Sequence, residues 1–194
     1  MIAPLYIFVF AGLFSPGPNV ILLTASGARF GFRPTLPHVL GVALGVGITA
    51  GLTGFGIGAI LTAMPALKLV LQIIACCWIL YMAWKLWTAQ AAGAQKDNDK
   101  DRPFTFIEAV LFQWVNPKIW AIAVAATTYT EGAGALESAW LLATAFSGIN
   151  LGVCLFWTIA GSLLTYLLTT PLAFRIFMRF MALLLGFSAL LVFL

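Results

Sequence analysis

The stretch Ser15-Pro16-Gly17-Pro18-Asn19 interrupts an otherwise apolar run and is the first place in the chain where polar chemistry could occur. Each proline lacks the backbone donor that an interior helical turn needs, and the residue before a proline is pushed out of the helical region. A helix therefore cannot run unbroken through this stretch. Inside a membrane, non-helical backbone persists only where it is buried in protein or lines a wet cavity.

A second interruption has the same chemistry and lies in the stretch Gln113-Trp114-Val115-Asn116-Pro117-Lys118. In both stretches a favoured N-cap residue precedes a proline, Ser15 in the first and Asn116 in the second. Each break is therefore predicted to start a half-helix, whose first amides are unsatisfied and carry a partial positive charge. Two such ends facing one cavity would favour an anion or a carboxylate.

Lys118 adds a formal positive charge beside the second break. An ionisable residue deep in a membrane costs at least about 2.5–3.5 kcal/mol, so it is a functional candidate by default. Alternatively, its ammonium snorkels outward, or only binds the carbonyls that the prolines free. The predicted residues for substrate binding and transport are Ser15, Pro16, Gly17, Pro18, Asn19, Gln113, Asn116, Pro117, Lys118 and Asn150. No catalytic residue, metal ligand or cofactor is expected.

The composition places these residues in a membrane protein. Hydrophobic residues make up 62% of the chain and charged residues 8%, whereas about a quarter of a soluble domain is charged. The chain has six apolar runs, and each is long enough for the roughly 20 residues that cross a bilayer. The predicted fold is an all-α membrane protein with six transmembrane helices. The runs cover residues 2–28, 37–63, 67–89, 104–129, 138–168 and 172–194.

Each break lies in the first span of a three-span half. Because three is odd, the two halves would cross the membrane in opposite directions. Inverted repeats with discontinuous first helices are a known transporter architecture, with the substrate at the midplane between the repeats. The chain is therefore predicted to be one transporter domain, residues 1–194, with discontinuous helices one and four. It would comprise a first repeat at 1–90, a cytoplasmic linker at 91–103 and a second repeat at 104–194.

The distribution of charge predicts the orientation. The net charge of +4 could indicate nucleic-acid binding, but the basic residues lie in short loops on one side of the spans. The positive-inside rule then puts these loops in the cytoplasm and both termini outside. We therefore expect the chain to be surrounded by a lipid bilayer and not to bind nucleic acid. The count is eight against one: Arg29, Arg33, Lys85, Lys96, Lys100, Arg102, Arg175 and Arg179 against Lys68.

The second span is rich in glycine. Small residues four apart let another helix approach closely in lipid. The sequence leaves open whether the partner helix belongs to the same chain or to a second protomer of a homodimer. His38, at the cytoplasmic end of this span, is expected to be a polar anchor without a role in transport. The glycine pairs are Gly41 with Gly45, Gly47 with Gly51 and Gly54 with Gly58.

With these motifs, the chain resembles the LysE/RhtB family of inner-membrane amino-acid exporters over essentially its whole length. The matching motifs are the two breaks, supported by Gly31-Phe32-Arg33 and by Tyr81-Met82-Ala83-Trp84-Lys85. The resemblance implies export of amino acids or close derivatives from the bacterial cytoplasm, driven by the proton gradient. Many members carry Asp where this chain has Asn19, and the Asn form looks more like the cysteine/O-acetylserine branch.

The residues also bear on the substrate and on competing functions. No Asp or Glu lies at the predicted membrane centre, so a small neutral amino acid fits better than a dibasic one. Its amine would be accepted by freed carbonyls, Asn19, Gln113 or Asn150. Glu108 and Lys118 are the only nearby titratable candidates for a proton carrier. A channel-like permease for small polar solutes and a non-transporting scaffold are the alternatives. An intramembrane enzyme would need a catalytic set that the spans lack.

Overall fold

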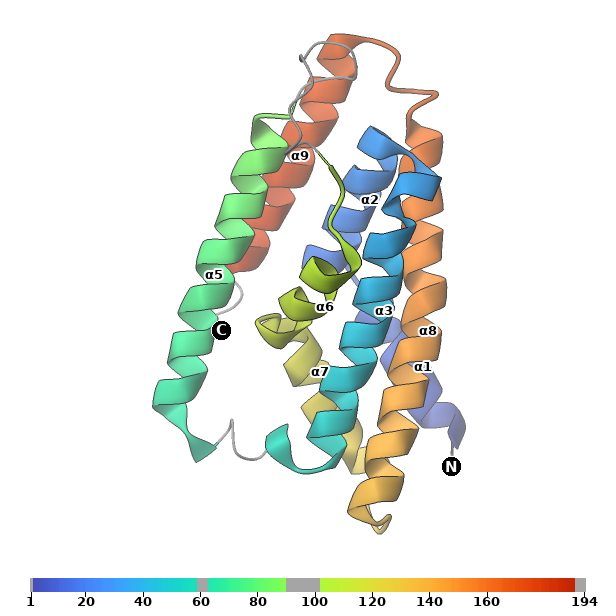
Figure 1. Ribbon diagram of the computed structural model, residues 1–194, viewed down its shortest axis with the longest axis vertical. Helices are drawn as coiled ribbons and strands as arrows, with labels where there is room; N and C mark the ends of the chain where they lie inside the picture. The colour runs from blue at the N-terminus through green and yellow to red at the C-terminus, as the bar shows by residue number, and fades with distance from the viewer. Residues whose placement is uncertain (1, 59–62, 90–101, 191–194) are drawn as a thin grey trace.

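The computed structural model describes residues 2–58, 63–89 and 102–190, and within these ranges the only regular secondary structure is helical. Four helices are each long and apolar enough to cross a membrane. They are α3 (Phe32–Gly54), α5 (Pro65–Trp87), α8 (Ala135–Leu164) and α9 (Pro171–Leu190), and they run along the long axis of the molecule (Figure 1).

Two further spans are broken. Helix α1 (Ile2–Phe14) is followed by α2 (Pro18–Phe30) at a bend of 58°. Helix α6 (Phe106–Trp114) is followed by α7 (Pro117–Ala126) and the 3₁₀ turn η1 (Thr127–Thr130) at a bend of 64°. When each bent pair is counted as one span, the described residues form six spans. The six-helix all-α fold with discontinuous helices one and four is thus confirmed.

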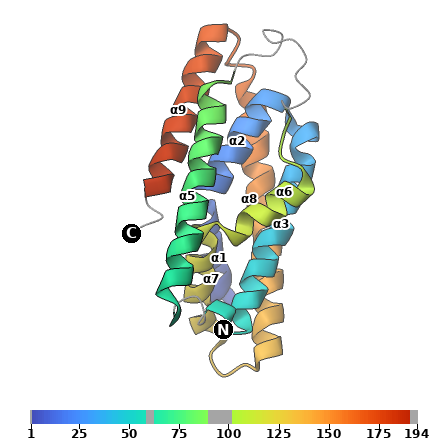
Figure 2. The same ribbon diagram turned by 60° about the vertical axis from the view of Figure 1, so that its left-hand side comes forward.

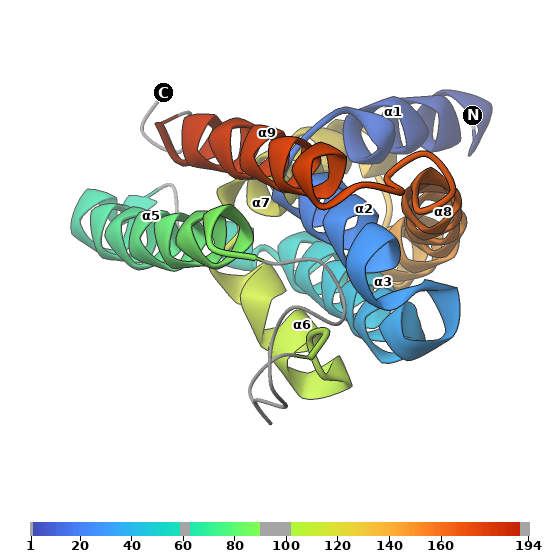
Figure 3. The ribbon, with the colours of Figure 1, turned by 90° about the horizontal axis from the view of Figure 1, so that it is seen from above.

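The unbroken spans pack against each other in two pairs. Helix α3 lies along α8, and α5 lies along α9 (Figure 2). Helix α2 lies between these pairs and packs against α8, whereas α6 lies at the periphery of the bundle and packs against α3 (Figure 3). This arrangement is consistent with two repeats. Residues 91–101 of the predicted linker lie outside the described residues.

The glycines of α3 serve packing within one chain. Gly41 faces α6, and a Cβ atom there would lie 2.3 Å from the carbonyl oxygen of Phe106. Gly54 faces α8, and a Cβ atom there would lie 2.6 Å from the Cα of Ala139. The predicted close helix approach is therefore observed, and it brings α3 against both α6 and α8.

Helices α2 and α8 cross at a second glycine contact. A Cβ on Gly27 would lie 2.3 Å from the carbonyl oxygen of Thr158, and one on Gly161 would lie 2.1 Å from that of Thr24. Both distances are far below van der Waals contact, so only glycine lets the two backbones approach this closely. The crossing fixes the half-helix that follows the first break.

Some boundaries differ from those predicted. Helix α3 begins at Phe32 rather than near residue 37, because Gly31 has a φ of 86° and reverses the chain directly after α2. Pro37 is therefore inside the helix. Helix α8 covers Ala135–Leu164 rather than residues 138–168, and α5 starts at Pro65, which occupies a first-turn position where proline is favoured.

Most basic residues gather at one end of the bundle, which we call the basic end. It is the upper end in Figure 1, where α2 and α5 end and where α3 and α9 begin. The N-terminus lies at the opposite end, as does Lys68 near the start of α5. The basic residues at the basic end that the structure describes are Arg29, Arg33, Lys85, Arg102, Arg175 and Arg179.

Candidate functional site

The first break differs in one detail from the prediction. Ser15 does not cap a half-helix: its amide donates to the carbonyl of Ala11 at 3.2 Å, and its hydroxyl donates to that of Gly12 at 2.8 Å. The N-cap of α2 is Gly17, with an extended backbone at φ −178°, and Pro18 is the first helical residue. The reason is that a residue before proline avoids the helical region. Pro18 therefore forbids a helix that starts at Pro16.

The second break follows the prediction. Asn116 is the N-cap of α7, with φ −84° and ψ 100°, and Pro117 takes the first helical position. The Asn116 side chain does not bond the amides of its own helix. Instead its Nδ2 donates to Oε1 of Gln113 at 3.4 Å. The first amides of α7 are thus left without a side-chain cap.

Lys118 joins the two breaks. Its Nζ donates to the carbonyl oxygen of Ser15 at 2.5 Å and to that of Pro16 at 3.4 Å. The ammonium does not snorkel outward but binds carbonyls that the prolines free, which is one of the alternatives given for this lysine. These carbonyls belong to the other half of the chain, so one cation neutralises the end of α1 from the start of α7. An ammonium has three donors, and these two bonds leave one more.

A pair of amide side chains makes a second link between the halves. Nδ2 of Asn19 donates to Oε1 of Gln113 at 2.8 Å, and Nε2 of Gln113 donates back to Oδ1 of Asn19 at 3.2 Å. Gln113 also donates to the carbonyl of Ala109 at 2.9 Å, one turn earlier in α6. The position of Asn19 is therefore fixed by α6 as well as by its own helix.

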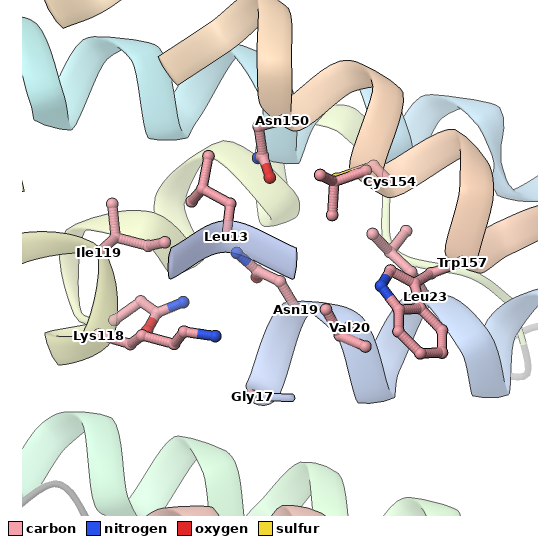
Figure 4. A pocket seen from close by; sticks show the side chains of 12 residues that line it. Leu13, Gly17, Asn19, Val20, Leu23, Lys118, Ile119, Asn150, Cys154 and Trp157 are labelled. Carbon is pink, nitrogen blue, oxygen red and sulfur yellow. The ribbon is translucent and has the colours of Figure 1, made fainter. Parts of the chain in front are cut away.

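Asn150 projects from α8 toward the same place (Figure 4). It lines a small pocket together with Asn19, Asn116 and Lys118. Its Nδ2 and the Oδ1 of Asn116 are buried, and neither has a hydrogen-bond partner among the described residues. The pocket volume of about 10 Å³ is close to that of one water molecule. The structure thus brings the predicted residues from α2, α6, α7 and α8 together.

A larger cavity of about 430 Å³ lies on the other side of the breaks. We call it the break cavity. Three of its polar lining residues were not predicted: Lys68 and Gln72 on α5, and Ser188 on α9. A polar residue within an apolar helix, such as Gln72, is a signal that could have found them. The lining comprises Pro16, Gly17, Pro18, Lys68, Gln72, Ile79, Asn116, Pro117, Lys118, Ala121 and Ser188.

Glu108, a predicted proton-carrier candidate, is held in a structural role. It is the third residue of α6 and forms a capping box with Thr105. Its two carboxylate oxygens also accept from the guanidinium of Arg102 at 2.7 and 2.9 Å. This carboxylate raises the pKa of Arg102 through the hydrogen bonds and the opposite charge. The carboxylate of Glu108 is thus directed toward Arg102 and Thr105.

The expectation for His38 was wrong. It is only 2% exposed rather than an interfacial anchor. Because α3 begins at Phe32, His38 lies in the second helical turn and its ring packs on that of Phe104, with centroids 4.9 Å apart.

The profile of LysE type translocators matches residues 10–194. The chain belongs to the LysE type translocator family. This membership confirms the resemblance of the motifs, and it makes the chain a multi-pass membrane transporter rather than an enzyme.

Named relatives agree with this membership. Cysteine/O-acetylserine efflux proteins of Salmonella choleraesuis (strain SC-B67) and Salmonella typhimurium (strain LT2) are each 31% identical over 156 residues, covering 77% of this chain and 76% of theirs. The protein of the same name from Escherichia coli O1:K1 is 29% identical over 154 residues. No solved structure matches the chain.

Proposed function

We propose that this LysE translocator is a bacterial inner-membrane secondary transporter that exports a small neutral amino acid or derivative. The observation that carries the proposal is the meeting of two helix breaks through Lys118 and the Ser15 carbonyl. The names of the relatives make cysteine and O-acetylserine the first candidates. The break cavity of about 430 Å³ is within the usual range for small-molecule sites.

The substrate carboxylate would bind where the two half-helices begin. Pro18 and Pro117 have no amide hydrogen, so the first available donors are the amides of Asn19 in α2 and Lys118 in α7. Both helix ends carry a partial positive charge. The third donor of the Lys118 ammonium adds a charge-assisted hydrogen bond, the strongest kind available to a carboxylate.

The same cavity selects against a second positive charge on the substrate. Among the residues that the structure describes, its lining includes two cations, Lys68 and Lys118, and no Asp or Glu. A single amine can be accepted by freed carbonyls, the Gln72 side-chain oxygen or the Ser188 hydroxyl. The side-chain ammonium of lysine would have no acid partner there and would be repelled by both cations.

An apolar layer separates the break cavity from the basic end. It contains Ile21 and Leu22 of α2, Ile79 and Met82 of α5 and Leu185 of α9, all buried in one cluster. Helices α5 and α9 pack mainly on each other. We infer that this pair moves as a body against the broken helices, opening the layer to the basic end while closing the side near Lys68. This is alternating access around a fixed site.

Orientation and energy source belong to the same proposal. The basic end would face the cytoplasm under the positive-inside rule, with both termini in the periplasm. Export against a gradient then requires coupling, for which the proton gradient is the proposed source.

The test is transport by purified protein in liposomes. Labelled cysteine, O-acetylserine, serine, alanine and lysine are presented with and without a proton gradient, and protein-free liposomes are the control. We expect saturable, gradient-dependent movement of a small neutral amino acid. Unsaturable flux without counterflow would indicate a channel instead, and a preference for lysine would contradict the assigned site.

A further inference from the structure

A groove lies between the first turns of α5 and one face of α7, and we call it the α5–α7 groove. Its volume is about 320 Å³. It adjoins the break cavity, but most of its lining is apolar and has no part in the proposed substrate site. The residues that it shares with the break cavity are Lys68, Gln72, Pro117 and Ala121.

The walls that belong to the groove alone offer little to a polar ligand. They include Leu71 on α5, Trp114 at the end of α6, and Trp120 and Val124 on α7. Nε1 of Trp120 donates to the carbonyl oxygen of Trp114 at 2.9 Å. This bond uses the single donor of the Trp120 indole within the chain. A hydrocarbon chain is the kind of group that such walls accommodate.

The groove is open to the surface that faces lipid. Helix α5 packs mainly on α9, and none of its residues from Pro65 to Gln72 is buried. On the opposite wall, Ala121 and Ala125 are exposed and lie one helical turn apart on the same face of α7. Trp114 is 42% exposed. Lipid can therefore enter the groove from the side.

Lys68 gives the groove a positive charge. It is the fourth residue of α5, it is exposed, and it lies at the end of the bundle opposite the basic end (Figure 1). Among the described residues, no Asp or Glu lines the groove and none pairs with Lys68. A cation at the membrane surface attracts the phosphate of an anionic lipid.

The length of the groove fits one leaflet of a bilayer. Along α7 it extends from Pro117 to Ala125, eight residues or about 12 Å. Half of the hydrocarbon core of a membrane is about 15 Å thick. The groove thus covers the depth between the outer end of α5, where Lys68 lies, and the break at Pro117.

We propose that the α5–α7 groove binds one anionic phospholipid, with its phosphate on the ammonium of Lys68 and one acyl chain along α7 over Ala125 and Ala121. A helix of a second copy is the less suitable occupant. Close helix approach in a membrane favours small residues, whereas Trp114 and Trp120 line this groove. The proposal does not depend on which solute is transported.

The test is photochemical cross-linking of the full-length protein in detergent with limiting lipid. The probe is phosphatidylglycerol that carries a diazirine at the end of one acyl chain, and cross-linked residues are mapped by mass spectrometry of peptides. Phosphatidylcholine with the same labelled chain is the matched neutral lipid. Unlabelled phosphatidylglycerol is added as competitor to show that labelling is saturable.

We expect saturable labelling of α7 and of the first turns of α5, with phosphatidylglycerol bound about fivefold more tightly than phosphatidylcholine, as one lysine at a membrane surface predicts. Lys68→Gln removes this preference and retains labelling by phosphatidylcholine. Arg175→Gln, an exposed cation at the basic end, leaves the preference unchanged.

A second variant tests the position of the acyl chain. Ala125→Trp fills the groove without touching the break cavity, since Ala125 is exposed and lines only the groove of these two. It should abolish labelling by both lipids. Leu183→Trp on the exposed surface of α9 is the control, and it should leave the labelling of α7 intact.

Three results would overturn the proposal. One is labelling of α7 no stronger than that of the lipid-facing residues of α9. Another is labelling that persists in Ala125→Trp. The third is loss of a dimer in Ala125→Trp with no change in lipid labelling, which would assign the groove to a second copy of the chain.

Discussion

The ammonium of Lys118 lies 2.5 Å from the carbonyl oxygen of Ser15, although the two residues are 103 positions apart. A cation at the start of one half-helix therefore neutralises the carbonyl end of another. Around this bond, Asn19 and Gln113 link the same two spans through their side-chain amides. Both links connect the half that ends at α5 with the half that begins at α6, and they do so at the proposed substrate site.

Gly17→Ala is expected to displace Lys118 and to reduce transport. An added Cβ would lie 2.9 Å from Cδ and 3.0 Å from Nζ of Lys118. Gly17 has an extended backbone that alanine also adopts, so the effect comes from the lysine rather than from strain. Liposome flux measures it, and Gly152→Ala, which has open space around its Cβ, is the matched control. Unchanged flux in Gly17→Ala would mean that transport does not depend on the position of the Lys118 side chain.

Gly161→Ala is expected to destabilise the protein by about 1–3 kcal/mol, because it overpacks the crossing of α2 and α8. Its Cβ would meet the backbone of Thr24 at 2.1 Å, where no flexible side chain can give way. Unfolding in detergent measures the change. Gly148→Ala in the same helix has nothing within 4 Å of its Cβ, and it should be neutral or slightly stabilising. Equal effects of the two substitutions would refute the close crossing.

Asn19 and Gln113 are expected to be energetically coupled. A double-mutant cycle with Asn19→Ala and Gln113→Ala should give a coupling free energy of unfolding of about 0.6 kcal/mol and at most about 1.7 kcal/mol, the average and the maximum for side-chain hydrogen bonds between membrane helices. The control is a second cycle that combines Thr144→Ala with Gln113→Ala, because the Thr144 hydroxyl donates only to carbonyls within its own helix α8. If the first pair proves additive, the reciprocal amide bond is absent.

Glu108→Gln is expected to keep the gradient dependence of transport. Glutamine still completes the capping box with Thr105, while the ion pair with the exposed Arg102 is lost, which changes stability little because solvent screens an exposed pair. Flux with and without a proton gradient measures the coupling, and Glu137→Gln in the first turn of α8 is the control. Loss of gradient dependence in Glu108→Gln alone would restore Glu108 as a proton carrier.

The sequence predicted the elements of the site well, because prolines act locally. Asn116-Pro117 starts α7 as expected, since an N-cap followed by proline defines a helix start without any tertiary contact. The first break contains two prolines, and the choice between them required the rule that Pro18 excludes Gly17 from a helix. With that rule, Gly17 rather than Ser15 could have been predicted as the cap.

Contacts between distant helices could not be predicted in the same way. The burial of His38 depends on Phe104, which lies beyond the linker between the halves. Gln72 and Ser188 reach the break cavity only because α5 and α9 pack beside the broken spans. In a membrane nearly all faces of a helix are apolar. The periodicity of its side chains therefore does not identify the helix against which it packs.

The most direct test of the account is whether transport requires a carboxylate that Lys118 recognises. We would measure saturable flux of labelled cysteine and of cysteamine by wild type, Lys118→Arg and Lys118→Gln in liposomes, with folding checked by thermal unfolding. The account predicts that wild type moves cysteine and not cysteamine. It also predicts that Lys118→Gln loses flux at least about tenfold, the loss of one charge-assisted hydrogen bond, while Lys118→Arg retains part of it. Wild-type flux in a folded Lys118→Gln, with an unchanged KM for cysteine, would contradict it.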